Sequence, residues 1–439
     1  MPKNMKKNRI KKHSAKCRRA SSRRINLCMI GFGLACVCCF SLIGLSNGHS
    51  GQNESRWIVE NGEVEILAPA AEAPSSRLSE SASQQPPKSR TSDQKPDDAT
   101  AAPTITTPPT AAATPEPTSE PDFVPITITS VGDCTIGGDI PSGAYKAFDR
   151  YFEEKGAGYF FSDVRDLFES DDLTIINLEG PLTDSTDERH GRAFNFRGKP
   201  EYVDILSGSS IEVCNVANNH AMDYGEQGLV DTANHLETAG IGVSGFSRVY
   251  QKEINGVNVC SIGFTEWDYS EDQIIQMVSL AREQCDLLLV SIHWGEEGSH
   301  EPTALQTRLG RKIVDAGADI VLGTHSHVYG GVEQYNGKYI IYSLGNFCFG
   351  GNRNPHDKDC MIFQQTFNVY PDGSVTDGGI NLIPARVSSS DNTNDFRPYI
   401  INDTRGITLL HKIARVSNVD VSQTIWMETS YPVAKGMVA

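Results

Sequence analysis

The sequence predicts an α/β fold with a layered sheet core, on two observations. From residue 126 onward, short apolar segments alternate with segments whose apolar residues recur at helical spacing. The short segments are apolar enough for strands that are covered on both faces, and the alternation is typical of sheets flanked by helices. The predicted strands are ITITSV (126–131), LTIINL (173–178), IEVCNVA (211–217), DLLLVSI (286–292), DIVLG (319–323) and KYIIYSL (338–344).

Two of the predicted helices lie between these strands and have recognisable ends. Apolar residues recur at helical spacing over 229–236, and this pattern stops at Gly240. A second helix is predicted over 305–313, because its apolar residues follow Pro302 and stop before Gly317. Residues after about 390 predict only a peripheral strand, a helix or a tail.

The N-terminal region predicts one transmembrane anchor. Residues 1–26 form a basic tail with eleven Lys and Arg and no acid, and residues 27–46 contain the uncharged, mostly apolar run Leu27–Leu45. Such a run has about the length that spans a ~30 Å hydrocarbon core. A cleaved signal peptide is the alternative, but no small-x-small cleavage site follows the run. A lipoprotein motif around Cys36 is disfavoured, because Gly33 stands where an aliphatic residue is expected.

The positive-inside rule keeps the basic tail in the cytoplasm. We therefore expect a single-pass protein of the cell membrane whose domain is extracellular. Residues 47–122 are rich in Pro, Ser, Thr and Ala, with little apolar content beyond WIVENGEVEIL. This composition predicts a disordered linker, either a spacer that lifts the domain off the membrane or a connection with no required reach.

Charge and cysteine content limit the class of protein. The net charge is −16 although the tail is strongly basic, so the remainder of the chain is acidic. Nucleic-acid binding needs a basic face on the folded part, and we expect no nucleic-acid partner. Five of the eleven cysteines lie in or beside the apolar run, and the body has no CxxC pair, so few or no disulfides are expected.

Polar residues that can bind metals stand at the carboxyl ends of five predicted strands. Because open α/β sheets place their ligands at these ends, we expect the residues to converge on one rim. Two carboxylates, an amide oxygen and four imidazoles form a mixed O and N set that suits Mn, Fe or Zn. The set is Asp133, Glu179, Asn219, His220, His293, His325 and His327.

Each of these residues alone also has a structural interpretation. Asp133 would suit a helix N-cap or a turn, and Glu179 a solvated turn before Gly-Pro. Asn218 and Asn219 would suit a left-handed turn, and His293 a hydrogen-bonded core position. Two imidazoles at i and i+2 after a buried strand have no common packing role. The occurrence of all five groups at successive strand ends favours a metal site.

Seven segments occur in the order of the motif series of one family. By them the chain resembles the poly-γ-glutamate capsule-synthesis (CapA-type) family over roughly 126–350. The resemblance implies a calcineurin-like metallophosphoesterase fold, with a layered β-sandwich over 123–390 and residues 391–439 as its C-terminal extension. The segments are GDCTIGGD (132–139), NLEGPLT (177–183), FNFRGKP (194–200), NVANNHAMDYGEQGL (215–229), HWGEE (293–297), GADIVLGTHSHV (317–328) and YSLGNFCFG (342–350).

The resemblance also implies a role for each residue of the set, in a site for two divalent transition-metal ions. Asp133 takes the place of the first acid, Glu179 that of the bridging acid, and Asn219 with His220 that of the Asn-His pair. The lone His and the final His-x-His correspond to His293, His325 and His327. Thr135 stands where the wider pattern has a His, so one ion is expected to be short of a ligand.

Five residues are expected to act on the substrate or to orient a residue that does. His220 is the expected general acid, and Asp223 is expected to orient it. Arg197 and Lys199 in FRGKP, together with Asn218, are the expected substrate-binding residues. An ordinary solvated surface pair is the alternative for Arg197 and Lys199.

The resemblance implies a role in making, anchoring or exporting poly-γ-glutamate or a related envelope polymer. We expect a metal-dependent hydrolase of phosphoesterase type, which acts on the polymer or a phosphorylated precursor beside membrane polymer-synthesis proteins. A non-catalytic scaffold of a synthesis or export complex is one alternative, which Thr135 favours. A generic extracytoplasmic phosphatase or nucleotidase is the other. The acidic domain would repel a polyanion at long range, so polymer binding should depend on local cationic groups.

Overall fold

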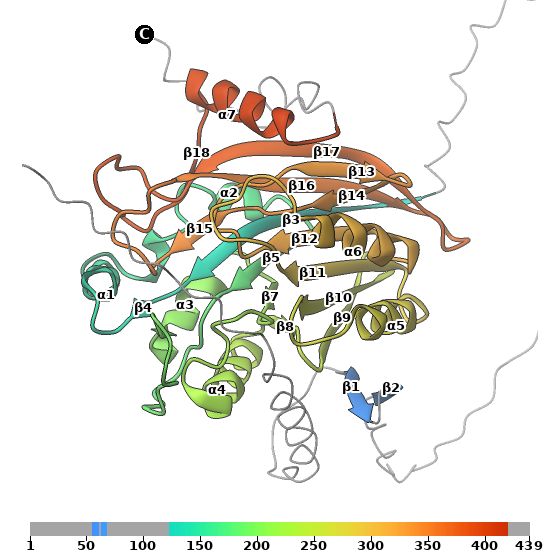
Figure 1. The fold of residues 1–439 in the computed structure, drawn as a ribbon. Helices are drawn as coiled ribbons and strands as arrows, with labels where there is room; N and C mark the ends of the chain where they lie inside the picture. Colours follow the sequence, from blue (N-terminus) through green and yellow to red (C-terminus); the bar gives the residue numbers. More distant parts are fainter. Residues whose placement is uncertain (1–54, 61–62, 68–122, 420–439) are drawn as a thin grey trace, which may run out of the picture. The chain divides into compact units, whose positions relative to one another are not determined.

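The computed structural model describes residues 55–60, 63–67 and 123–419 of the chain. In this part, two β-sheets pack face to face and helices cover their outer faces (Figure 1). The prediction of an α/β sandwich flanked by helices is thereby confirmed. The predicted anchor at 27–46 lies outside the described residues. Within the described ranges, no helix is both long and apolar enough to cross a membrane.

The first sheet has the order β13-β14-β12-β11-β10-β9-β1-β2. Its centre is parallel, because β10, β11, β12 and β14 run in one direction. Its strands are β1 (Ser55–Glu60), β2 (Glu63–Leu67), β9 (Arg248–Ile254), β10 (Val257–Thr265), β11 (Leu287–His293), β12 (Ile320–Thr324), β13 (Val332–Tyr335) and β14 (Lys338–Ile341).

The second sheet has the order β18-β17-β16-β3-β5-β7-β8, and β15 pairs with the end of β3. Strands β3, β5, β7 and β8 are parallel, whereas β16 and β17 form a long antiparallel hairpin. The strands are β3 (Val124–Thr135), β5 (Leu173–Leu178), β7 (Val213–Asn215), β8 (Gly242–Ser244), β15 (Asn346–Phe349), β16 (Asp359–Val369), β17 (Val375–Arg386) and β18 (Tyr399–Ile400). A separate pair joins β4 (Gly138–Asp139) and β6 (Phe196–Arg197).

Helices cover the outer face of each sheet (Figure 1). Helices α1 to α4 pack on the outer face of the second sheet, and α5 and α6 pack on the outer face of the first. Helix α7 instead packs on β17 and against the core between the sheets. Both helices predicted between strands are confirmed, as α4 and α6. The helices are α1 (Gly143–Lys155), α2 (Arg165–Phe168), α3 (Val203–Ser207), α4 (Gly225–Thr238), α5 (Glu271–Arg282), α6 (Ala304–Asp315) and α7 (Thr404–Arg415), with 3-10 turns at Ala157–Tyr159 and Pro200–Tyr202.

The alternation of apolar side chains along each strand produces three core layers. In β11, Leu287 and Leu289 face the other sheet, whereas Leu288 and Val290 face the helices. Because successive side chains point to opposite faces, a strand that is covered on both sides needs apolar residues at every position. This explains why the predicted strands are continuous apolar runs. The six cysteines of the described part are free, in agreement with the cysteine pattern.

Part of the predicted linker at 47–122 forms strands. Strands β1 and β2 pair with each other, and β1 also pairs with β9 at Ser55 and Arg56. The sequence between them is Asn61-Gly62, which favours two-residue hairpin turns, and the flanking WIV and VEIL segments suit strands. At residues 55–60 and 63–67 the structure therefore has strands where the sequence predicts a disordered linker, because the local turn and strand preferences outweigh the overall composition. The other linker residues lie outside the described part.

The C-terminal extension adds to the same domain up to residue 419. Strand β18 pairs with β17, and α7 buries Leu409 and Ile413 in the core between the sheets. The side chain of Asp403 accepts a bond from the Arg405 backbone N–H and begins this helix. The peripheral strand and helix that were open alternatives after residue 390 are therefore both present.

Candidate metal centre

The predicted site residues converge where parallel strands of both sheets end. The pairing of β3 with β5 sets Asp133 beside Asn177, and the pairing of β11 with β12 sets His293 beside Thr324. Glu179 directly follows β5. Because the two sheets pack face to face, these strand ends meet at one rim of the sandwich (Figure 1).

The first group of ligand atoms combines two buried carboxylates with an imidazole. Donor atoms of Asp133, Glu179 and His327 lie within 4.8 Å of one another. Nδ1 of His327 is 3.2 Å from Asp133 Oδ2, and its Nε2 is 3.7 Å from Glu179 Oε1. Both carboxylates are fully buried. A histidine that faces two buried acids through both ring nitrogens has the donor chemistry of a metal ligand.

Glu179 provides a direct test of whether a cation fits this site. Its Oε1 is buried and has no hydrogen-bond partner among the described residues, whereas its Oε2 accepts from Thr135 Oγ1 at 3.3 Å. A buried carboxylate oxygen without a donor is unfavourable unless a cation meets it. The residues present therefore fit a bound metal ion.

The second group gathers around His293. Its Nε2 is 2.9 Å from Asn219 Oδ1, 3.1 Å from His325 Nδ1 and 3.8 Å from Glu179 Oε1. Its Nδ1 lies 2.9 Å from the Thr324 hydroxyl, which leaves Nε2 directed at the site. An amide oxygen, an imidazole nitrogen and a carboxylate oxygen thus lie within 3.8 Å of His293 Nε2, and Glu179 also belongs to the first group.

The backbone is shaped to present these side chains. His325 and His327 have φ angles of 96° and 60°, which non-glycine residues rarely adopt, at a cost of about 1–3 kcal/mol each. From this turn the His327 ring faces the two carboxylates, and the His325 ring contacts His293. Gly132 permits a close backbone approach, because a Cβ there would lie 1.8 Å from the Gly345 carbonyl oxygen. That approach lets the Asp133 N–H donate to the same oxygen at 2.9 Å.

The ionisation of the group reflects its burial and its mixed charge. Burial raises the pKa of Glu179 to about 7, and burial holds the pKa values of His293 and His325 below their usual range. For His327, burial is outweighed by Glu179 and Asp133, which raise its pKa to about 10. For Asp133, burial is outweighed by His327 and His293, which lower its pKa. A divalent ion bound here would stabilise the ionised form of both carboxylates.

His220 lies beside the cluster and is held by Asp223. Its Nδ1 is 2.5 Å from Asp223 Oδ2, and its ring stacks on Phe196 at 4.0 Å. Asp223 is fully buried and also accepts from the Phe196 N–H at 2.7 Å. The group of Asp133, Glu179 and His327 does not include His220. The acid role and the ligand role of His220 both stay predictions.

The three predicted substrate-binding residues have other partners. Lys199 pairs with Asp149 at 2.6 Å, and Arg197 donates to the Ser185 carbonyl at 2.6 Å and lies over the Tyr224 ring. Asn218 donates to the Leu178 carbonyl at 2.8 Å, so it ties two strand ends together. These contacts favour positioning roles, and substrate binding by these residues stays a prediction.

Sequence reasoning did not single out several residues that contact the site. Asn177 donates to Asp133 Oδ1 at 2.8 Å, and Asn346 Oδ1 lies 3.0 Å from His327 Nδ1. Arg192 donates to the Asn219 carbonyl at 3.0 Å, and the exposed Trp267 lies 5.1 Å from the His325 ring. Asn177 and Asn346 lie within the family motifs, so their place in those motifs could have identified them as site residues. Arg192 and Trp267 lie outside them.

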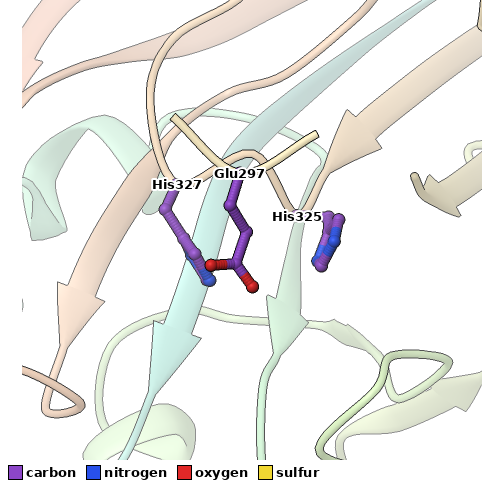
Figure 2. Close-up of side chains that lie close together, drawn as sticks. All are labelled: Glu297, His325 and His327. Atoms are coloured by element: carbon purple, nitrogen blue, oxygen red, sulfur yellow. The ribbon is translucent and has the colours of Figure 1, made fainter. Parts of the chain in front are cut away.

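Glu297, the last residue of the HWGEE segment, is a further site residue that the sequence pattern does not predict. It forms a second cluster with His325 and His327, whose donor atoms again lie within 4.8 Å of one another. Figure 2 shows its carboxylate between the two rings.

Known proteins resemble this chain over about half of its length. The CapA protein of poly-γ-glutamate (PGA) biosynthesis from Bacillus subtilis is 34% identical over 236 residues, which cover 48% of this chain and 62% of the relative. The capsule biosynthesis protein CapA of Bacillus anthracis is 31% identical over 254 residues, which cover 51% and 60%. The chain thus spans about 60% of the length of these relatives. The solved protein TT1561 of Thermus thermophilus is 10% identical, with a TM-score of 0.30 over 58% of this chain and 99% of that one.

A family model extends over the part of the chain that carries the site. The model described as "Bacterial capsule synthesis protein PGA_cap" matches residues 127–351, more than half of the chain. This range includes most of β3 and all of β5, β7, β11 and β12, whose carboxyl ends bear the candidate ligands. This chain therefore belongs to the bacterial capsule synthesis protein family PGA_cap.

Proposed function

We propose that this protein is a membrane-anchored, metal-dependent hydrolase of phosphoesterase type that acts in the biosynthesis of poly-γ-glutamate capsule or a related envelope polymer. The observation that carries the proposal is the buried, unpartnered Oε1 of Glu179 at the point where both ligand groups of the described residues meet. The polymer class comes from the family and from the names of the two Bacillus relatives.

The two ligand groups divide the proposed metal ligands. Asp133, Glu179 and His327 would hold one ion, and Asn219, His293 and His325 would hold the other, with Glu179 shared. Ions of the Mn, Fe or Zn class supply Lewis acidity toward a phosphoryl oxygen when bound.

The chain's own residues would move the proton and hold the anion. Asp223 fixes Nδ1 of His220, so Nε2 is left to donate a proton to a leaving oxygen. Stacking on Phe196 keeps the ring in that orientation. Arg192 is exposed at the rim and makes one described bond, to the Asn219 carbonyl, so its other N–H groups can bind a phosphate or carboxylate.

The proposed site faces the outside of the cell, on the same surface as the envelope polymer and membrane polymer-synthesis partners. The basic tail, the apolar run and the positive-inside rule support this topology. Protease added to intact cells should release a fragment that begins between residues 48 and 125. Protection of the domain until the cells are lysed would contradict the topology.

Elemental analysis of the purified full chain tests the metal site. The wild type should carry transition metal, and His293→Ala or the double variant His325→Ala with His327→Ala should carry less while retaining the circular dichroism of the fold. A metal-free wild type that regains none after incubation with Mn²⁺ or Zn²⁺ would refute the site.

The scaffold alternative rests on Thr135, which occupies a ligand position with a hydroxyl that binds Glu179. His220→Asn separates the two functions in cells. A hydrolase should lose polymer production in this variant while still binding its membrane partners. Normal polymer from His220→Asn would favour the scaffold. Rapid turnover of simple phosphate esters, without any effect of the gene on polymer, would favour a generic phosphatase.

A further inference from the structure

The loop after β11 carries Glu297 to the solvent side of the metal centre. A carboxylate oxygen of Glu297 and ring nitrogens of His325 and His327 lie within 4.8 Å of one another. Figure 2 shows the carboxylate directed between the two rings. An acid and two imidazoles at this spacing have the ligand types and the proximity that bind a divalent transition metal.

Backbone bonds hold this loop against the histidine turn. The Gly298 N–H donates to the Ser326 carbonyl at 2.7 Å, and Ser326 separates the two histidines. The Gly295 N–H donates to Glu266 Oε2 at 3.2 Å, and Gly295 and Gly298 have φ angles of 90° and 77°. The position of Glu297 is therefore set by a tight turn that is tied on both sides of it.

The first ligand group has room for a further ligand. Asp133, Glu179 and His327 supply three protein ligands, and a catalytic transition-metal site takes a fourth and at times a fifth ligand. Thr135 stands where the resemblance implies a His, and its hydroxyl donates to Glu179 Oε2. Thr135 thus orients a ligand and does not supply an imidazole.

We propose that Glu297 is a metal ligand that completes the centre from the solvent side, in place of the imidazole that Thr135 lacks. Glu297 would bind the same ion as His327, since His327 belongs to both clusters of ligand atoms. With Glu297 the centre has three carboxylates for two divalent ions, so the protein would neutralise one more positive charge of the ions. This inference rests on the proposed function, because it concerns the same metals.

Glu296 provides a matched control in the same loop. It is exposed like Glu297 and carries the same charge, but neither ligand cluster of the described residues includes it. Glu296→Gln and Glu297→Gln therefore change the net charge equally and differ only in the proposed contact. Because both side chains are exposed, neither substitution should disturb the fold.

The test is metal titration of the full chain after chelation, with Mn²⁺ and Zn²⁺ as probes, followed by gel filtration and elemental analysis. Glu297→Gln should raise the Kd of one ion about tenfold or more and lose that ion on the column. Glu296→Gln should match the wild type. If Glu297→Gln retains both ions with wild-type Kd, the inference is wrong and the proposed function stands. If the wild type itself binds no metal, the proposed function fails.

Discussion

Asp223→Asn isolates the charge that supports His220. In the structure one oxygen, Asp223 Oδ2, accepts both from His220 Nδ1 and from the Phe196 N–H. Its Oδ1 has no hydrogen-bond partner among the described residues. An asparagine can therefore place its side-chain oxygen where Asp223 Oδ2 lies and its NH₂ group where Asp223 Oδ1 lies. The geometry should persist while the negative charge is lost.

The expected size of the effect follows from the kind of bond that is weakened. A hydrogen bond to a charged group contributes about 1 kcal/mol more than a neutral one, and about 1.4 kcal/mol is a tenfold change in rate. Asp223→Asn should thus lower kcat about fivefold, whereas His220→Asn should remove general acid catalysis and cost about 10²–10⁴-fold.

The assay compares hydrolysis of phenyl phosphate and p-nitrophenyl phosphate by metal-loaded protein. Phenolate is the poorer leaving group and needs the proton more, so both variants should lose more activity on phenyl phosphate. Glu226→Gln removes an exposed charge nearby and should behave as the wild type. Equal losses on both esters, or loss of bound metal in Asp223→Asn, would refute the assignment of His220 as the acid.

Three further predictions concern residues outside the ligand set. Arg192→Ala should raise the inhibition constant of inorganic phosphate about tenfold, with a smaller rise for Arg192→Lys; an unchanged constant would exclude an anion contact. Lys358 is 5% exposed and donates to three backbone carbonyls at 2.7 to 3.1 Å, so Lys358→Met should lower the free energy of unfolding by about 3 kcal/mol, or Tm by about 6 °C. Lys412 is exposed, so the control Lys412→Met should lower that free energy by under about 0.5 kcal/mol, and equal Tm values for the two variants would contradict the prediction. Burial raises the pKa of Asp171 to about 7, above the unfolded value of about 3.9, so the folded state favours the neutral carboxyl. The contribution of Asp171 to stability therefore falls as pH rises from about 4 to about 7, and Asp171→Asn should remove this fall when the free energy of unfolding is measured against pH.

The sequence alone determined the parallel strands and the residues at their ends. Strands that are covered on both faces must be apolar throughout, so β5, β11 and β12 were visible as continuous runs. A polar residue at the end of such a run has little packing role, and this is why Glu179 and His293 could be selected before the structure was known. The antiparallel hairpin β16–β17 was not identified, because much of β17 is exposed and lacks that continuous pattern.

Only the tertiary structure decided which side chains meet across long separations. The Gly298 N–H donates to the Ser326 carbonyl and the Gly295 N–H donates to Glu266, and these two bonds hold Glu297 beside two histidines about thirty residues away. From the sequence, Lys199 is expected to bind substrate, yet in the structure it pairs with Asp149 on α1. Loop positions depend on such distant backbone and side-chain partners. The local pattern of a loop carries no information about them, whereas the alternation along a strand reports directly on what covers it.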